Sequence, residues 1–215
     1  MNKKLDNKKK ITEIFKSFNQ ESIDIIILRK QENLFDNNND DIDILASYKD
    51  FKKLKKILKK NGLLFYSDSK YINDYLYKSI PHHHFYNKNL GLNFDISFDI
   101  SYRSINNQEF IPIDDEQLDY IWGNKIKIIK NDFYFFQMDK YSQIIHLISH
   151  CIFDKKNFSD YYRNKISELI IEIDKTIFFE MIEPIFYKYK KRLFELIKDQ
   201  KFDNIFNDYI SYKEY

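Results

Sequence analysis

The chain has 215 residues, of which 43% are hydrophobic and 32% are charged, and its formal net charge is +2. This composition is typical of a globular protein with a core; it excludes a disordered chain and gives no sign of a strongly basic nucleic-acid-binding domain. Cys151 is the only cysteine, which excludes an intramolecular disulfide. No apolar region follows the basic start and no apolar run approaches the about 20 residues of a membrane span, so we expect a cytoplasmic protein without membrane contact.

The first half of the chain is predicted to mix helices with strands, because its apolar residues change between helical spacing and short runs rich in isoleucine. Helices are predicted over about the first 20 residues and from Ser47 onward, where Ser47 and Asp50 match a capping box and Gly62 is placed to end the helix. The predicted strands are 23–28, 41–46, 63–66, 79–86, 92–100 and 125–129. The turn sequence NKNLG predicts that two of them form a hairpin.

From about residue 132 the pattern is helical. The predicted helices are 136–153, 159–174 and 176–199, with Pro184 kinking or breaking the last one. We therefore predict an α+β fold. A mixed β-sheet with flanking helices would span residues 1–131, and a C-terminal helical bundle would span residues 132–215.

Two segments carry carboxylates in an alternating pattern. The segment DDIDIL places Asp41 and Asp43 on one face of a predicted strand, and LNFDISFDI places Asp95 and Asp99 on the polar face of a later one. Like charges on one strand face repel and aspartate is a poor strand former, so a requirement other than folding is indicated. A divalent cation is the simplest such requirement. A solvated acidic edge is the alternative.

The order of these features resembles the DNA polymerase β-like nucleotidyltransferase superfamily, and more closely its small bacterial and archaeal members. The resemblance rests on LR…DDIDIL, HHHFY, LNFDI and, in the helical region, HLISHCIFDKKNFSDYY. It implies a nucleotidyltransferase-type sheet followed by a helical bundle. It also implies that Asp41 and Asp43 form the Asp-x-Asp pair of the family and that Asp95 is the third carboxylate, with Asp99 as the alternative.

By this resemblance, Asp41, Asp43 and Asp95 are expected to be both the catalytic residues and the metal ligands. They would hold two Mg²⁺ ions, or Mn²⁺, beside a nucleoside triphosphate, and Asp95 would accept the proton of the acceptor hydroxyl. The expected reaction moves a nucleoside monophosphate to an acceptor, for which a small molecule, a tRNA end and a protein all stay open.

The sequence departs from the family pattern at the loop before the Asp-x-Asp segment. Family members usually have Gly-Gly or Gly-Ser there, whereas this strand ends in Leu-Arg-Lys. We expect Arg29 and Lys30 to bind the nucleotide phosphates in place of backbone contacts. The missing glycine also supports an alternative function, a catalytically inactive binding or regulatory module. A toxin or antitoxin component is a further alternative, which the resemblance implies because small relatives often work in pairs.

Histidines mark two further positions. His82 and His84 are expected on one face of a strand, where they are candidates to contact the nucleotide, while His83 faces the other way. His146 and His150 lie four residues apart on a predicted helix, a spacing that metal ligands use. Their apolar surroundings favour polar residues at the interface between the helices and the sheet domain.

Overall fold

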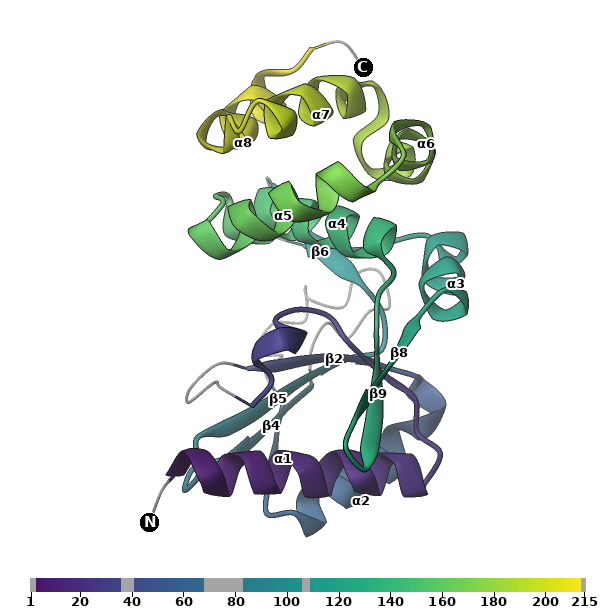
Figure 1. Cartoon of the computed structure of the whole chain (residues 1–215), viewed down its shortest axis with the longest axis vertical. Coiled ribbons are helices and arrows are strands. Elements are labelled where there is room, and N and C mark those ends of the chain that lie inside the picture. The colour runs from purple at the N-terminus through teal and green to yellow at the C-terminus, as the bar shows by residue number, and fades with distance from the viewer. Residues whose placement is uncertain (1–2, 36–40, 68–82, 106–108, 214–215) are drawn as a thin grey trace.

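The computed structural model describes residues 3–35, 41–67, 83–105 and 109–213. One face of a central mixed sheet carries two helices, and the other is turned toward the C-terminal helices (Figure 1). The described strands are β1 Ile25–Ile27, β2 Ile42–Ala46, β3 Leu64–Ser67, β4 His83–Asn87, β5 Leu92–Ser97, β6 Ser101–Arg103, β7 Phe110–Pro112, β8 Ile126–Lys130 and β9 Phe133–Gln137. The described α-helices are α1 Lys3–Gln20, α2 Phe51–Lys60, α3 Asp115–Gly123, α4 Lys140–Ser149, α5 Asp160–Glu172, α6 Lys175–Phe186, α7 Lys190–Lys198 and α8 Phe202–Ser211.

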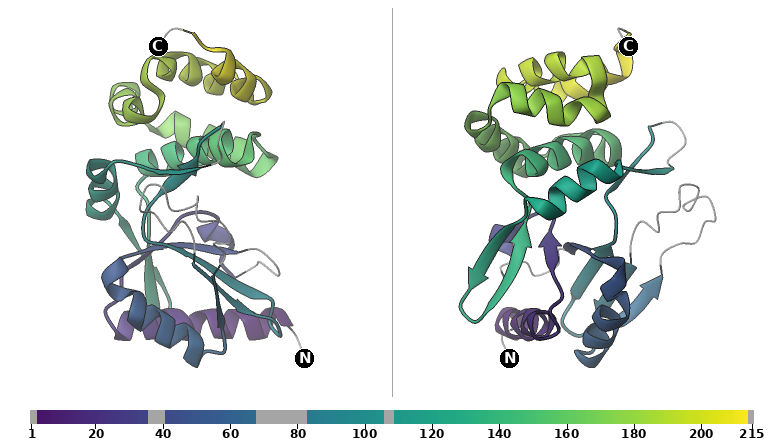
Figure 2. Two further views of the ribbon diagram at one scale, coloured as in Figure 1. Left: turned by 180° about the vertical axis from the view of Figure 1, so that it is seen from behind. Right: turned by 90° about the vertical axis from the view of Figure 1, so that its right-hand side faces the viewer.

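The main sheet of the described residues has seven strands in the order β3-β4-β5-β2-β1-β9-β8. The pairs β2–β5 and β1–β9 are parallel, and the other neighbours are antiparallel. Strands β6 and β7 form a separate two-stranded sheet, and Figure 2 shows this pair close to the C-terminal helices. The predicted α+β class, with a mixed sheet, flanking helices and C-terminal helices, is therefore confirmed.

Helices α1 and α2 cover one face of the sheet. Phe15 and Phe18 of α1 and Leu54 of α2 are fully buried against apolar side chains of the sheet. In β2, Ile42 and Ile44 belong to this same core. Because side chains alternate along a strand, the residues between them project from the opposite face, toward the C-terminal helices.

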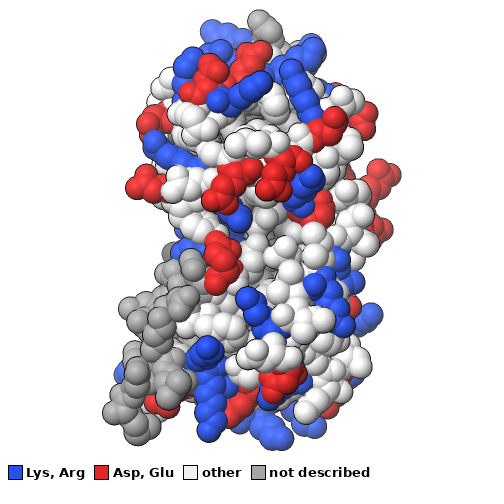
Figure 3. Space-filling model, viewed as in Figure 1, with Lys and Arg blue, Asp and Glu red and all other residues white. Residues whose placement is uncertain are grey.

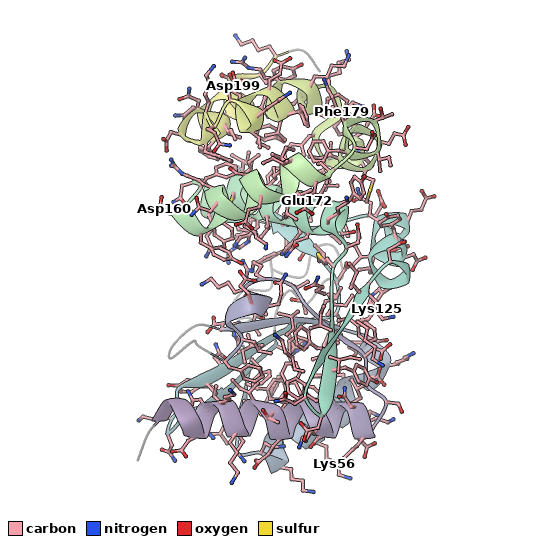
Figure 4. All side chains as sticks on the ribbon, in the orientation of Figure 1. Lys56, Lys125, Asp160, Glu172, Phe179 and Asp199 are labelled. Carbon is pink, nitrogen blue, oxygen red and sulfur yellow. The ribbon has the colours of Figure 1, made fainter. Side chains whose placement is uncertain are left out.

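The C-terminal helices have their own apolar core, which contains Phe178, Phe186 and Tyr189. Pro184 lies inside α6, and the chain leaves the helix only after Phe186, where Tyr187 has φ +45°. The predicted helix over 176–199 is thus two helices, α6 and α7. In Figure 4, Asp160 and Glu172 mark the two ends of α5 below this core, and Phe179 lies on α6.

Three details differ from the sequence-based predictions. Strand β9 takes the first two residues of the helix predicted over 136–153, and α4 begins only at Lys140. The run FYFFQ is aromatic, which suits a half-buried strand, and β9 pairs with β1, so the sheet extends past residue 131. Ser47 and Asp50 form no capping box, because a 3₁₀ turn, Tyr48–Asp50, precedes α2 and neither side chain caps it. Sequence patterns also missed α3, α8, β6 and β7, and the two strands have only three residues each, too few for a clear period.

Other predictions are met. Gly62 ends α2 with φ +78°, and its N–H donates to the Lys59 carbonyl at 2.9 Å. The hairpin β4–β5 forms, although residues 79–82 of the predicted strand lie outside the described residues. Within the described ranges no helix is both long and apolar enough to span a bilayer. Acidic and basic side chains are interspersed over the face seen in Figure 3.

Candidate active site

Strands β2 and β5 bring the two acidic segments together. They pair in parallel with Asp43 opposite Asp95, so both side chains project from the same face of the sheet. This is the face turned toward the C-terminal helices, because the intervening isoleucines belong to the core under α1 and α2. Asp41 directly precedes β2, and its Oδ1 accepts a hydrogen bond from Asn93 Nδ2 at 2.9 Å.

A cavity of about 300 Å³, here called the aspartate cavity, lies over these carboxylates. Five carboxylates line it against three cationic side chains, so its lining is acidic overall. The lining residues are Leu28, Arg29, Asp41, Asp43, Asp95, Ser97, Asp99, Ile100, Ser101, Arg103, Phe110, His146, His150, Asp154 and Lys155. The structure therefore brings Arg29 and both acidic segments to one place, and Asp99 lies there as well as Asp95.

Arg29 forms a two-pronged ion pair with Asp43. Its Nε donates to Oδ2 at 3.2 Å and its Nη2 donates to Oδ1 at 2.6 Å, and the two side chains are only 15% and 14% exposed. Burial raises the pKa of Asp43 and so do Asp95 and Asp41, while Arg29 opposes the rise. The guanidinium thus offsets the repulsion between the clustered carboxylates.

The helical part adds polar residues to the same cavity. A π-helical turn, His150–Lys155, continues α4, and Arg29 Nη1 donates to His150 Nε2. The other ring nitrogen, Nδ1, bonds Asp154 Oδ2 at 2.8 Å, and Asp154 Oδ1 accepts from the backbone N–H of Arg103 at 3.0 Å. Burial lowers the pKa of His150 to about 4, with Arg29 and Lys155 acting in the same direction and Asp154 against it.

His146 lies one turn before His150 and is also buried. Its Nδ1 is 2.9 Å from the Tyr102 hydroxyl, and within the described part of the chain its Nε2 has no hydrogen-bond partner. Burial, together with the neighbouring Arg29 and His150, lowers the pKa of His146 well below its ordinary value. The imidazole is therefore neutral at pH 7, and one ring nitrogen is left to bond with something else.

Lys30 and His84 do not line the aspartate cavity. Lys30 has φ +55°, a left-handed conformation that glycine adopts without strain; its N–H donates to the Tyr161 hydroxyl at 3.1 Å, and its Nζ lies 5.7 Å from the Tyr161 ring centroid. His84 lies opposite Asp95 across β4–β5, with 3.9 Å between its Nε2 and Asp95 Oδ1. His82, the other predicted contact, lies outside the described residues.

The donor chemistry of the cavity fits a divalent cation, because carboxylate oxygens are the ligands that Mg²⁺ and Mn²⁺ prefer. In this structure the carboxylate of Asp43 is not available to a cation, because Arg29 donates hydrogen bonds to both of its oxygens. Within the described ranges, no three His, Cys, Asp or Glu side chains are arranged to hold a metal ion. A metal ion would therefore take the place that Arg29 has on Asp43.

Sequence patterns did not reveal the Arg29–Asp43 pair or the contribution of Asp154. Arg29 and His150 are separated by 121 positions in the chain, and no local pattern links them. The sequence did indicate His146 and His150, because residues four apart share one helix face. They were predicted to lie at the interface between the helices and the sheet, and both line the cavity there.

Two solved structures are similar to this chain, and one of them supports the fold assignment. The solution structure of the antibiotic-resistance factor ANT(2'')-Ia aligns over 86% of this chain and 94% of its own, with a TM-score of 0.54 at 8% identity. The crystal structure of the lincosamide antibiotic adenylyltransferase LnuA with bound lincomycin aligns over 75% of this chain and 94% of its own, with a TM-score of 0.43 at 13% identity. The likeness to ANT(2'')-Ia shows that the fold is shared.

A search of curated proteins found no match. A family model described as uncharacterised nucleotidyltransferase matches residues 38–169, which include β2, β5, α4 and most of the aspartate cavity. The match covers more than half of the chain. The chain therefore belongs to this nucleotidyltransferase family, and it is a transferase that acts on nucleotides.

Proposed function

We propose that the protein transfers a nucleoside monophosphate from a nucleoside triphosphate to an acceptor hydroxyl, with Asp41, Asp43 and Asp95 as its catalytic centre. The observation that supports this most strongly is the parallel register of Asp43 and Asp95 in a cavity that Asp41 also lines. Two strands separated by about 50 residues in the chain converge there on an acidic cluster. Folding alone gives no reason for such a cluster, because like charges side by side on a sheet are destabilising.

In the proposed reaction the acceptor oxygen attacks the α-phosphorus of the nucleoside triphosphate. A new oxygen–phosphorus bond forms, the bond between the α-phosphorus and the bridging oxygen breaks, and pyrophosphate leaves with that oxygen. Asp95 accepts the proton of the acceptor hydroxyl. Asp95 is the better candidate for this role than Asp99, because Asp95 lies in β5 directly opposite Asp43, whereas Asp99 follows the end of that strand.

Two Mg²⁺ ions, or Mn²⁺, would be held by Asp41, Asp43 and Asp95. When bound, such ions neutralise the phosphate charge and stabilise the attacking and leaving oxygens. Asp43 would exchange the guanidinium of Arg29 for the metal, and Arg29 would then be free to bind a phosphate through the same planar fork of donors. Arg29 would thus act as an internal cation that keeps the carboxylates together until the nucleotide arrives.

The experiment is a thermal shift with ATP, CTP, GTP or UTP, each with and without Mg²⁺, followed by transfer from an α-labelled form of the stabilising nucleotide. We expect stabilisation by one or more nucleotides that requires Mg²⁺ and is absent in D43N. D208N is a matched control, because Asp208 lies in α8, does not line the aspartate cavity and pairs with Arg192. Metal-independent stabilisation that persists in D43N would instead favour an inactive nucleotide-binding module.

A further inference from the structure

A second cavity lies on the other side of β6 from the carboxylates. Ser101 and Arg103 line the aspartate cavity, whereas Tyr102, between them, lines a pocket of about 200 Å³. This alternation is that of a strand with a cavity on each face. The pocket is lined by residues of α3, α4 and α6 and is called here the α3–α6 pocket. In Figure 1, α3 and α6 are labelled to the right of α4. His146 lines both cavities.

The walls of the α3–α6 pocket are largely apolar, and the charged side chains among its described lining residues are carboxylates. Ile121, Ile145 and Ile185 form part of the apolar wall, and the carboxylates of Glu116 and Glu180 lie at its rim. Within the described part of the chain, neither glutamate has an ion-pair or hydrogen-bond partner in this pocket, and no Lys or Arg lines it. Such a lining favours a molecule with an apolar body and a positive charge.

The backbone of α6 adds a further acceptor. Pro184 lines the pocket and has no N–H to donate to the carbonyl of Glu180, one helical turn earlier. Helix α3 is tied to this stretch, because Gln117 Nε2 donates to the Met181 carbonyl at 3.1 Å. An ammonium group, which carries only donors, matches acceptors arranged in this way.

His146 supplies the second, independent indication of a ligand. Its side chain is 7% exposed, lines the pocket, and leaves Nε2 without a partner in the described residues while Nδ1 faces the Tyr102 hydroxyl. A buried polar atom of this kind normally has a hydrogen-bond partner, so Nε2 is available to water or to a bound ligand. A hydroxyl held at Nε2 would lie at the wall shared with the cavity of Asp95.

We propose that the α3–α6 pocket binds a small organic ammonium compound with an apolar body and a hydroxyl group, and that this compound is the acceptor. The binding site stands on its own lining, whereas the acceptor role rests on the proposed function. Glu116 and Glu180 select the positive charge, the isoleucines select the apolar body, and His146 positions the hydroxyl.

The test measures binding of four small probes by calorimetry in the absence of nucleotide. Tyramine has the ring, the ammonium and the hydroxyl; 4-ethylphenol lacks the charge, 4-hydroxyphenylacetate reverses it, and glucosamine lacks the apolar body. We expect tyramine to bind at least about fivefold more tightly than each of the others. In E116Q/E180Q the preference for tyramine over the uncharged 4-ethylphenol should be lost. D119N should keep this preference, because Asp119 is an exposed residue of α3 outside the pocket.

A second comparison isolates His146. We expect tyramine to bind about fivefold more tightly than phenethylamine, which lacks the hydroxyl, and this ratio to fall to about one in H146F. The proposal is overturned if 4-ethylphenol, 4-hydroxyphenylacetate or glucosamine binds as tightly as tyramine, or if E116Q/E180Q has no effect on tyramine. The ratio in H146F is unaffected by a uniform loss of folded protein, and the glutamate variants give a result even if H146F does not fold.

The acceptor role is tested separately by adding Mg²⁺ and the nucleotide found to bind. Tyramine should increase pyrophosphate release in the wild type and in D119N, and less so in E116Q/E180Q. Tyramine that binds without increasing release would overturn the acceptor role. Because the binding assays contain no nucleotide, failure of the proposed nucleotide transfer would leave them unchanged, and failure of tyramine to bind would leave transfer to another acceptor intact.

Discussion

The ion pair between Arg29 and Asp43 allows a quantitative prediction. In R29M the carboxylate of Asp43 keeps its burial and its acidic neighbours but loses both hydrogen bonds from the guanidinium. Removing one partner of a buried pair typically costs about 3–5 kcal/mol. Since both side chains are about 15% exposed, we expect the lower end, a loss of about 3 kcal/mol in the free energy of unfolding.

The assay is urea unfolding at pH 7, followed by the fluorescence of Trp122, the only tryptophan. In R29M/D43N the charge that Arg29 bonds directly is removed together with Arg29, so the double variant should lose about 2 kcal/mol less than the sum of the single variants. R192M removes an exposed ion-pair partner of Asp208 and serves as control, which should unfold at the same urea concentration as the wild type.

Magnesium gives the same variants a second use. With the guanidinium gone, the carboxylates of R29M should bind Mg²⁺ more readily than those of the wild type. At a Mg²⁺ concentration ten times the dissociation constant, binding would restore about 1.4 kcal/mol of the free energy of unfolding. The addition of D43N should abolish this rescue. A loss below about 1 kcal/mol in R29M, or strict additivity in the double variant, would refute the idea that Arg29 balances the carboxylates.

Three further predictions concern the site and its support. D95N should lower nucleotide transfer at least about 100-fold and D99N less than about tenfold, measured with an α-labelled nucleotide; equal losses would contradict the assignment of the proton acceptor. The pKa of His150 is about 4 in the folded protein and near about 6.5 in the unfolded chain, so the unfolded state takes up the proton first as the pH falls. The free energy of unfolding should therefore drop by about 2 kcal/mol from pH 7 to pH 5. H150Q should remove this part of the pH dependence. G62A should lower the free energy of unfolding by about 1 kcal/mol, because φ is +78° and the new Cβ would lie 3.3 Å from the side-chain amide of Asn87. G123A is the control, because a Cβ there meets nothing within 4 Å and stability should not fall.

The acidic face was predictable because strands impose a period of two on their side chains. Isoleucines on either side of Asp43 and the apolar neighbours of Asp95 had to enter a core, so the aspartates had to project from the other face. Parallel pairing then set Asp43 opposite Asp95. The period does not extend to Asp99, because β5 ends at Ser97. Asp99 reaches the cavity from the bend beyond the strand.

The partners of Arg29 were not predictable, because they depend on contacts between distant parts of the chain. The resemblance suggested a phosphate ligand, whereas the guanidinium bonds Asp43 and contacts His150. The loop that follows shows how the missing glycine is accommodated. Lys30 itself adopts the left-handed conformation, and Tyr161 of α5 accepts its N–H and donates to Glu32. A helix distant in the chain thus supports a left-handed backbone at Lys30, a conformation that glycine would adopt without strain.

A crystal structure with Mn²⁺ and a non-hydrolysable nucleoside triphosphate tests the central claim most directly. We predict anomalous peaks from Mn²⁺ within coordination distance of Asp41, Asp43 and Asp95, and Arg29 moved from Asp43 onto a phosphate. A nucleotide bound elsewhere, or Arg29 still paired with Asp43 while nucleotide and Mn²⁺ are bound, would contradict the account.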